Sequence, residues 1–167
     1  MFHIGDVVVY GTEGVCEIRE ITEVRFGKES NEYYVLSPIA KATDTFYVPT
    51  SAEKVLLRMR PVLSKEQAEE LLKLIPSTPF EWIENERERI DAYKKILLYG
   101  TSEDVMSMAR CLYFHQIEQL EKGKKLHASD ERFLKDAEKL LFDEISYVLG
   151  ISQSEVMPLI MKAREEK

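Results

Sequence analysis

The residue pattern changes character near Pro61. Before it, β-branched and aromatic residues alternate with polar ones in short runs, which is typical of strands joined by brief turns. After it, apolar residues recur every three or four positions, and the segments they define begin and end with helix caps. The change predicts an α+β chain of 167 residues, with a β domain over residues 1–61 and a helical domain over residues 62–167.

About five short strands are expected in the β domain. The first is residues 7–10, where Gly5-Asp6 provides turn chemistry before the strand and Gly11 and Gly14 flank the turn after it. The remaining candidates are residues 15–19 continuing over 21–26, then 32–37, 45–49 and 55–57. Short strands with short connections predict a small, strongly bent barrel of the Tudor-like kind, which binds partners more often than it catalyses.

Five helices are expected after Pro61, each marked by a local signal. The N-terminal signals are Ser64-Lys65-Glu66-Gln67, Thr78-Pro79-Phe80-Glu81, Thr101 or Ser102, Ser129, and Ser152-Gln153-Ser154-Glu155. Predicted C-terminal limits are Leu74, Gly100, Gly123 and Gly150, and Pro158 falls inside the last helix. Two apolar stripes are predicted to be core: Val105, Met108, Ala109, Leu112, Ile117 and Leu120, then Phe133, Leu134, Ala137, Leu140, Leu141, Ile145, Val148 and Leu149.

Composition and motifs argue against several functions. The formal net charge of −7 argues against free, non-specific nucleic-acid binding, which requires a basic surface. The three histidines, His3, His115 and His127, fall on different elements, and no phosphate-binding, dinucleotide, zinc-protease or paired-cysteine motif occurs. We therefore expect neither an enzyme nor a bound cofactor or metal.

The remaining bulk features point to a cytoplasmic chain. Cys16 and Cys111 lie far apart, which indicates two reduced thiols rather than a disulfide. The first residues turn polar at once, unlike a signal peptide, and no apolar run approaches the roughly 20 residues that span a bilayer. We expect a monomer without membrane contact.

Trp82 is the only tryptophan and the most distinctive single residue. The pattern places it in the first turn of a helix whose core stripe is Ile83, Ile90, the Lys94 stem and Leu97. Helix geometry then puts Trp82 at the edge of the buried face, near Arg89 and Tyr93. Such a residue can pack between helices, anchor an interface or wedge against a base pair, and this geometry favours packing.

The two halves together resemble a family of bacterial transcription regulators. The opening FHIGDVVVYGTEGVCEI, the segments EYYVLSP, TFYVP and RPVLSKEQAEELL, and the helical segments WIENERERIDAYKKIL, KLHASDERFLKDAEKLLFDEI and LGIS are similar to the CarD/CdnL family. The β domain is similar to the RNA-polymerase-interacting module that also occurs in the transcription-repair coupling factor.

The resemblance implies docking on the β subunit of RNA polymerase and stabilisation of the open promoter complex without sequence-specific reading. It assigns promoter-DNA contacts to Trp82, Arg87, Arg89, Lys94 and Lys95, with Trp82 as a wedge at the upstream bubble edge. It assigns polymerase contacts to Val24, Arg25, Phe46, Tyr47 and Val48. The chain departs from the family pattern after Trp82, where Ile83-Glu84-Asn85-Glu86 replaces a basic run, and at Tyr47, where an arginine is usual.

Two other functions remain open. One is an adaptor that binds polymerase or another protein without touching DNA. The other is a sequence-specific DNA binder that uses LGISQSEVMPLI as a helix-turn-helix end, although its last helix offers few base-reading side chains besides Gln153.

Overall fold

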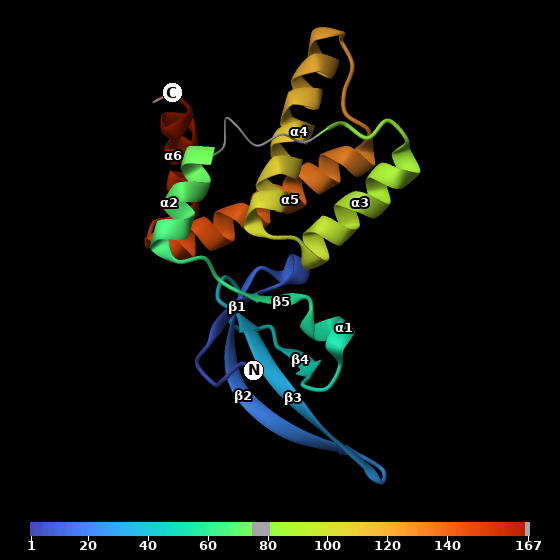
Figure 1. Ribbon diagram of the computed structural model, residues 1–167, viewed down its shortest axis with the longest axis vertical. Coiled ribbons are helices and arrows are strands. Elements are labelled where there is room, and N and C mark those ends of the chain that lie inside the picture. Colours follow the sequence, from blue (N-terminus) through green and yellow to red (C-terminus); the bar gives the residue numbers. More distant parts are fainter. Residues whose placement is uncertain (75–80, 166–167) are drawn as a thin grey trace. The chain divides into compact units, whose positions relative to one another are not determined.

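The chain forms two compact units, residues 1–62 and residues 63–167, which are described separately. The structure is a computed structural model, and it describes residues 1–74 and 81–165 (Figure 1). A five-stranded antiparallel sheet precedes a set of helices, so the predicted α+β class is confirmed.

The N-terminal unit is built on a sheet with strand order β4-β3-β2-β1-β5, which makes β4 and β5 its edges. Figure 1 shows β2 and β3 as a long curved hairpin. An irregularity in the β2–β3 register between Ile18 and Glu20 contributes to this bend. The elements are β1 (Val7–Tyr10), a 3-10 turn (Gly11–Glu13), β2 (Val15–Phe26), β3 (Glu29–Pro38), β4 (Phe46–Pro49), α1 (Glu53–Leu56) and β5 (Met59–Pro61).

One face of the sheet encloses the core of this unit. Because side chains alternate along a strand, every strand contributes inward residues to a single cluster. The cluster contains Val8, Cys16, Ile18, Tyr34, Leu36, Val48 and Met59. The other face of β2–β3–β4 is left outside this core.

The predicted strand at residues 55–57 is wrong. Residues 53–56 form the helical turn α1, and the closing strand β5 follows it and pairs with β1 through Val9 and Arg60. The backbone N–H groups of Val55 and Leu56 both bond to the Ala52 carbonyl, which starts a helical turn instead of a ladder. A three-residue apolar run carries no period, so the sequence pattern could not distinguish the two.

The C-terminal unit contains α2 (Lys65–Leu74), α3 (Glu86–Tyr99), α4 (Ser102–Glu121), α5 (Ala128–Leu149) and α6 (Gln153–Glu165). One predicted capping box and one predicted N-cap are confirmed. Ser64 Oγ accepts from Gln67 N at 3.1 Å while Gln67 Oε1 accepts from Ser64 N at 2.8 Å. Thr101 and Asp104 make the same reciprocal pair at the start of α4. The Thr78-Pro79 signal lies outside the described residues.

Two other helix predictions need correction. Helix α5 begins at Ala128 rather than after a Ser129 cap, and His127 precedes it without a side-chain capping bond. Ile117 and Leu120, predicted as core, are 37% and 60% exposed because the last two turns of α4 extend past the packed part of the bundle. Gly150 does end α5, with a left-handed φ of 67° that a residue with a Cβ rarely adopts.

The helical core centres on α4 and α5, where the predicted stripe of α5 is largely buried. Three acidic residues that the stripe omits are also buried in α5: Asp130, Asp143 and Glu144. Glu144 accepts from Ser102 Oγ at 2.7 Å and from Leu63 N at 3.0 Å, which ties the start of this unit and the start of α4 to α5.

Candidate functional surfaces

An aromatic patch covers the outer face of the β2–β3–β4 sheet. Val24, Phe26, Tyr33 and Tyr47 line a shallow recess there, and we call these four residues the sheet patch. Phe26 is 66% and Tyr47 58% exposed, and the rings of Tyr33 and Tyr47 meet edge to face with centroids 6.4 Å apart. Large exposed apolar side chains grouped in this way are characteristic of protein interaction sites.

The structure divides the predicted protein contacts between the two faces of the sheet. Val24 and Tyr47 belong to the sheet patch, and Arg25 is exposed on the opposite face of β2. Val48 is fully buried in the sheet core, and Phe46 packs against that core with its ring 6.2 Å from Tyr10. Side-chain contact by Phe46 and Val48 is therefore corrected, because the strand that exposes Tyr47 turns its neighbours inward.

The sequence reasoning missed Phe26 and Tyr33. The period of two was the available signal, since Phe26 lies two residues after Val24 on the same face of β2. The cross-strand pairs Thr22–Tyr33 and Val35–Tyr47 bring the aromatic residues of β3 and β4 together, and this register is a property of the fold.

Trp82 lies before α3 and not in its first turn as predicted. The helix begins at Glu86, capped by Asn85, whose side chain accepts from Glu88 N at 3.0 Å. The indole stacks on the His115 imidazole of α4, with ring centroids 3.6 Å apart and 14° between the planes. The Arg89 guanidinium carbon lies 4.4 Å from the indole centroid. Because an imidazole at 3.6 Å fills one face, the guanidinium occupies the other.

Arg89 is buried, with 3% of its surface exposed, and it holds the segment around Trp82 in place. Its Nε and Nη2 donate to the two carboxylate oxygens of Asp130, each at 2.9 Å, and Nη1 donates to the Ile83 carbonyl at 2.9 Å. The bonded Asp130 carboxylate raises the pKa of Arg89 further. The prediction of Arg89 as a phosphate contact is corrected, because its guanidinium is enclosed and already paired.

The buried stripe of α3 also differs from the predicted one. Its buried residues are Arg89, Tyr93 and Leu97, whereas the Lys94 side chain is exposed. The buried stripe is rotated by about one residue, or roughly 100°, from the predicted one. Arg89 occupies the buried position that was expected for Ile90.

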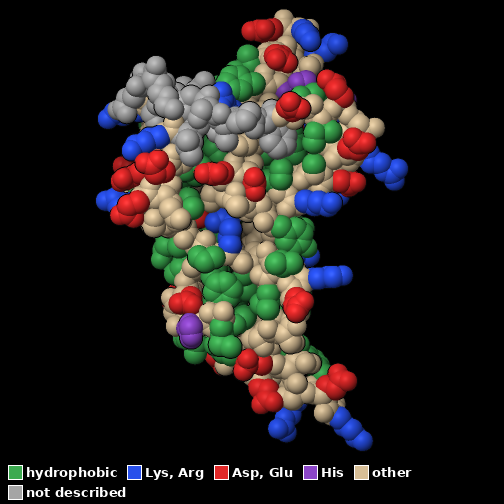
Figure 2. All heavy atoms as spheres, in the orientation of Figure 1, with side chains coloured by type: hydrophobic (Ala, Val, Ile, Leu, Met, Phe, Trp, Pro, Cys, Tyr) green, Lys and Arg blue, Asp and Glu red, His purple; other side chains and the backbone are tan. Residues whose placement is uncertain are grey.

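Three of the predicted DNA contacts remain on the surface. Arg87, Lys94 and Lys95 are exposed on α3, seven and eight residues apart, which places them along one side of the helix. No ion pair engages them within the part of the chain that the structure describes. Acidic residues lie among them, and Figure 2 shows red and blue side chains interspersed over the visible face of the helical unit.

Neither a metal centre nor a membrane span is found in residues 1–74 and 81–165. No group of three or more His, Cys, Asp or Glu side chains there is arranged to hold a metal ion. Over the same residues, no helix combines the length and apolar character needed to cross a membrane.

Comparison with known proteins identifies the N-terminal unit. Residues 2–63 match the family described as the CarD-like/TRCF RID domain, where RID denotes the RNA-polymerase-interacting domain. The N-terminal unit is thus similar to this family over its whole length. The match covers every strand of the sheet and all four residues of the sheet patch. A domain of this family is a polymerase-interacting module and not an enzyme class.

The similarity to a curated relative extends through the helical unit. The chain is 26% identical over 166 residues to a Bacillus subtilis (strain 168) protein named "Putative transcription factor YdeB". The alignment covers 93% of this chain and 97% of that protein. The predicted resemblance to the CarD/CdnL family is thereby confirmed, and the two comparisons support a role in transcription regulation.

Proposed function

We propose that the protein docks on the β subunit of RNA polymerase through its N-terminal unit and stabilises the open promoter complex through DNA contacts that do not read sequence. The observation that carries the docking step is the sheet patch, an exposed aromatic face on a domain of the CarD-like/TRCF RID family. Aromatic side chains supply most of the large contributions to protein interfaces.

The edge strand β4 offers a second means of attachment. Its outer backbone groups have no neighbouring strand in the sheet, so an extended segment of a partner could pair with it. In that arrangement the backbone N–H and C=O of Tyr47, which point away from β3, contribute hydrogen bonds, and the Tyr47 side chain adds contact from the sheet patch. Arg25 is exposed at the end of β2, close to the turn of the β2–β3 hairpin.

DNA contact is proposed for Arg87, Lys94 and Lys95. A net charge of −7 makes binding to free duplex weak, but a protein held beside DNA by polymerase needs little intrinsic affinity. Tethering raises the effective concentration to roughly the millimolar range, so a few phosphate contacts suffice. Trp82 has a supporting role here, because both faces of its ring are already covered by His115 and Arg89.

The alternative of an adaptor without DNA contact is supported by one specific observation. Glu84, Glu86 and Glu88 lie around Arg87, and Asp91 lies one helical turn before Lys94 and Lys95, which weakens the positive field at this surface. The two functions share the docking step and differ only in whether α3 touches DNA.

The docking step is tested by measuring affinity for core RNA polymerase of Bacillus subtilis with the full chain and two matched variants. Tyr47→Ser removes an aromatic residue of the sheet patch, and Tyr99→Ser removes a tyrosine of α3 that is 47% exposed. We expect Tyr47→Ser to weaken binding by about ten- to thirtyfold, as for an interface hot spot, and Tyr99→Ser to leave it unchanged. Equal affinities for all three proteins, with far-ultraviolet circular dichroism unchanged, would exclude the sheet patch as the docking surface.

A further inference from the structure

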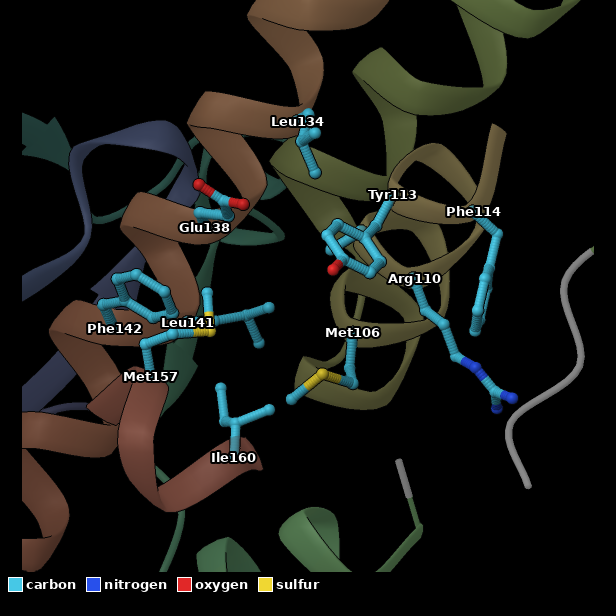
Figure 3. Close-up of a pocket in the computed structure, with 11 residues that line it drawn as sticks. Met106, Arg110, Tyr113, Phe114, Leu134, Glu138, Leu141, Phe142, Met157 and Ile160 are labelled. Atoms are coloured by element: carbon cyan, nitrogen blue, oxygen red, sulfur yellow. The ribbon is translucent and has the colours of Figure 1, made fainter. Parts of the chain in front are cut away.

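A recess opens in the helical unit between α4, α5 and α6. Its volume is about 370 Å³, within the range of sites that hold small organic ligands. Figure 3 shows the side chains that converge on it from the three helices. Its walls are mainly apolar and include two methionines, Met106 and Met157, whose flexible thioethers adapt to the shape of an occupant.

Two polar side chains of the lining, Glu138 and Tyr113, determine its chemistry. Glu138 is half-buried beside Phe142, and Tyr113 turns its hydroxyl toward the interior of the recess (Figure 3). Within the part of the chain that the structure describes, neither side chain makes a hydrogen bond or an ion pair. Burial raises the pKa of Glu138, because the ionised carboxylate loses hydration without gaining a compensating charge.

Among the described residues of the lining, the one cation does not compensate Glu138. Arg110 belongs to the α4 wall, and its guanidinium carbon lies 5.3 Å from the centre of the Phe114 ring. Figure 3 shows the Arg110 side chain extending along Phe114, away from the α5 wall that carries Glu138. With respect to the described residues, the Glu138 carboxylate is therefore an uncompensated negative charge at an apolar surface, which costs free energy unless a cation pairs with it.

Aromatic rings complete the chemistry of the recess. Tyr113 and Phe114 of α4 and Phe142 of α5 line it together with Glu138. Ring faces attract cations, and a carboxylate among aromatic walls is a combination that selects organic ammonium groups. The apolar remainder of the lining fits the hydrocarbon part of the same ligand.

We propose that this recess binds an organic cation, an amine with an apolar body, whose ammonium group pairs with Glu138 and lies against the aromatic walls. Such a site is separate from the polymerase and DNA surfaces proposed above. It would make the helical unit responsive to a small molecule.

The experiment uses the full chain labelled with carbon-13 at its methionine methyl groups, with Met106 and Met157 assigned by substitution. The probes are 4-phenylbutylamine, the neutral 4-phenylbutanol and the anionic 4-phenylbutyrate, which share one apolar body. We expect the amine to shift the Met106 and Met157 signals and to bind about tenfold more tightly than the alcohol, as for one charge-assisted hydrogen bond. The butyrate should bind most weakly.

Two variants and a control separate the charge from the cavity. Glu138→Gln should remove the preference for the amine while keeping the weak binding of the alcohol. Ala109→Leu, at a small residue of the α4 wall, should weaken all probes by filling space. Glu121→Gln, an exposed glutamate at the end of α4, should change nothing. The proposal is overturned if no probe shifts these signals at millimolar concentration, if the amine and the alcohol bind equally, or if the preference survives Glu138→Gln.

Discussion

Removing the carboxylate of Asp130 should destabilise the helical unit more than any surface change. Asp130 is fully buried and accepts two hydrogen bonds of 2.9 Å from Arg89, which is 3% exposed. In Asp130→Ala, two guanidinium donors lose their acceptors where water cannot replace them. Breaking a buried ion pair in this way costs about 3–5 kcal/mol.

Trp82 fluorescence provides the assay. As the only tryptophan of the chain, it reports on the helical unit alone, and its ring contacts both His115 and Arg89. With a urea dependence of about 2 kcal/mol per molar, the expected loss lowers the unfolding midpoint by about 1.5–2.5 M. The slope of the urea transition should stay unchanged, because the variant exposes the same surface area on unfolding.

Two comparison variants make the result interpretable. Glu131→Ala breaks the exposed pair with Lys135 one residue further along α5, and it should cost less than about 1 kcal/mol. The double change Arg89→Met with Asp130→Leu removes both charges together and should regain most of the loss. A midpoint for Asp130→Ala no lower than that for Glu131→Ala would refute the view that this ion pair organises the segment around Trp82.

Three other predictions follow from the same unit. Trp82→Ala should cost about 1–3 kcal/mol, less than for a fully buried tryptophan, and circular dichroism during urea unfolding should detect it; an unchanged midpoint would mean that the indole does not pack. Gly100→Ala should cost about 1–3 kcal/mol, because an added Cβ would lie 2.5 Å from the Ile96 carbonyl oxygen, and an unchanged Trp82 fluorescence midpoint would contradict this. Glu138→Gln should stabilise the protein at pH 7. Folding raises the pKa of Glu138, so ionisation of this side chain opposes folding at pH values above the ordinary glutamate pKa of about 4.3. The stability gained in Glu138→Gln should therefore vanish below that pH. A gain in thermal unfolding temperature that does not depend on pH would show that the Glu138 charge is not its cause.

Local signals in the sequence accounted for much of the fold. The capping pairs of Ser64 with Gln67 and of Thr101 with Asp104 span three residues each, so the sequence alone contains both partners. The glycine-flanked first strand, Val7–Tyr10, was found at its predicted position for the same reason. In these three elements the residues that determine the geometry are close neighbours in the chain, so pattern and structure agree.

The candidate surfaces depended on contacts between residues far apart in the sequence. Arg89 and Asp130 are 41 residues apart, and nothing in either neighbourhood indicates that the charges are buried together. An arginine that lies among glutamates, as Arg89 does, is expected at the surface. For that reason the predicted buried stripe of α3 left out Arg89 and was displaced by about one residue. The sheet patch likewise required the register of three strands, which alternation within one strand does not provide.

The lifetime of open promoter complexes after addition of a competitor tests the account most directly. The wild-type chain should lengthen this lifetime with polymerase present. The triple change Arg87→Gln, Lys94→Gln and Lys95→Gln should remove the effect without weakening polymerase binding. Trp82→Phe should preserve most of the effect, because a ring still fills the space between His115 and Arg89. The account is contradicted if the wild-type chain leaves the lifetime unchanged, or if folded Trp82→Phe abolishes the effect while the triple variant retains it.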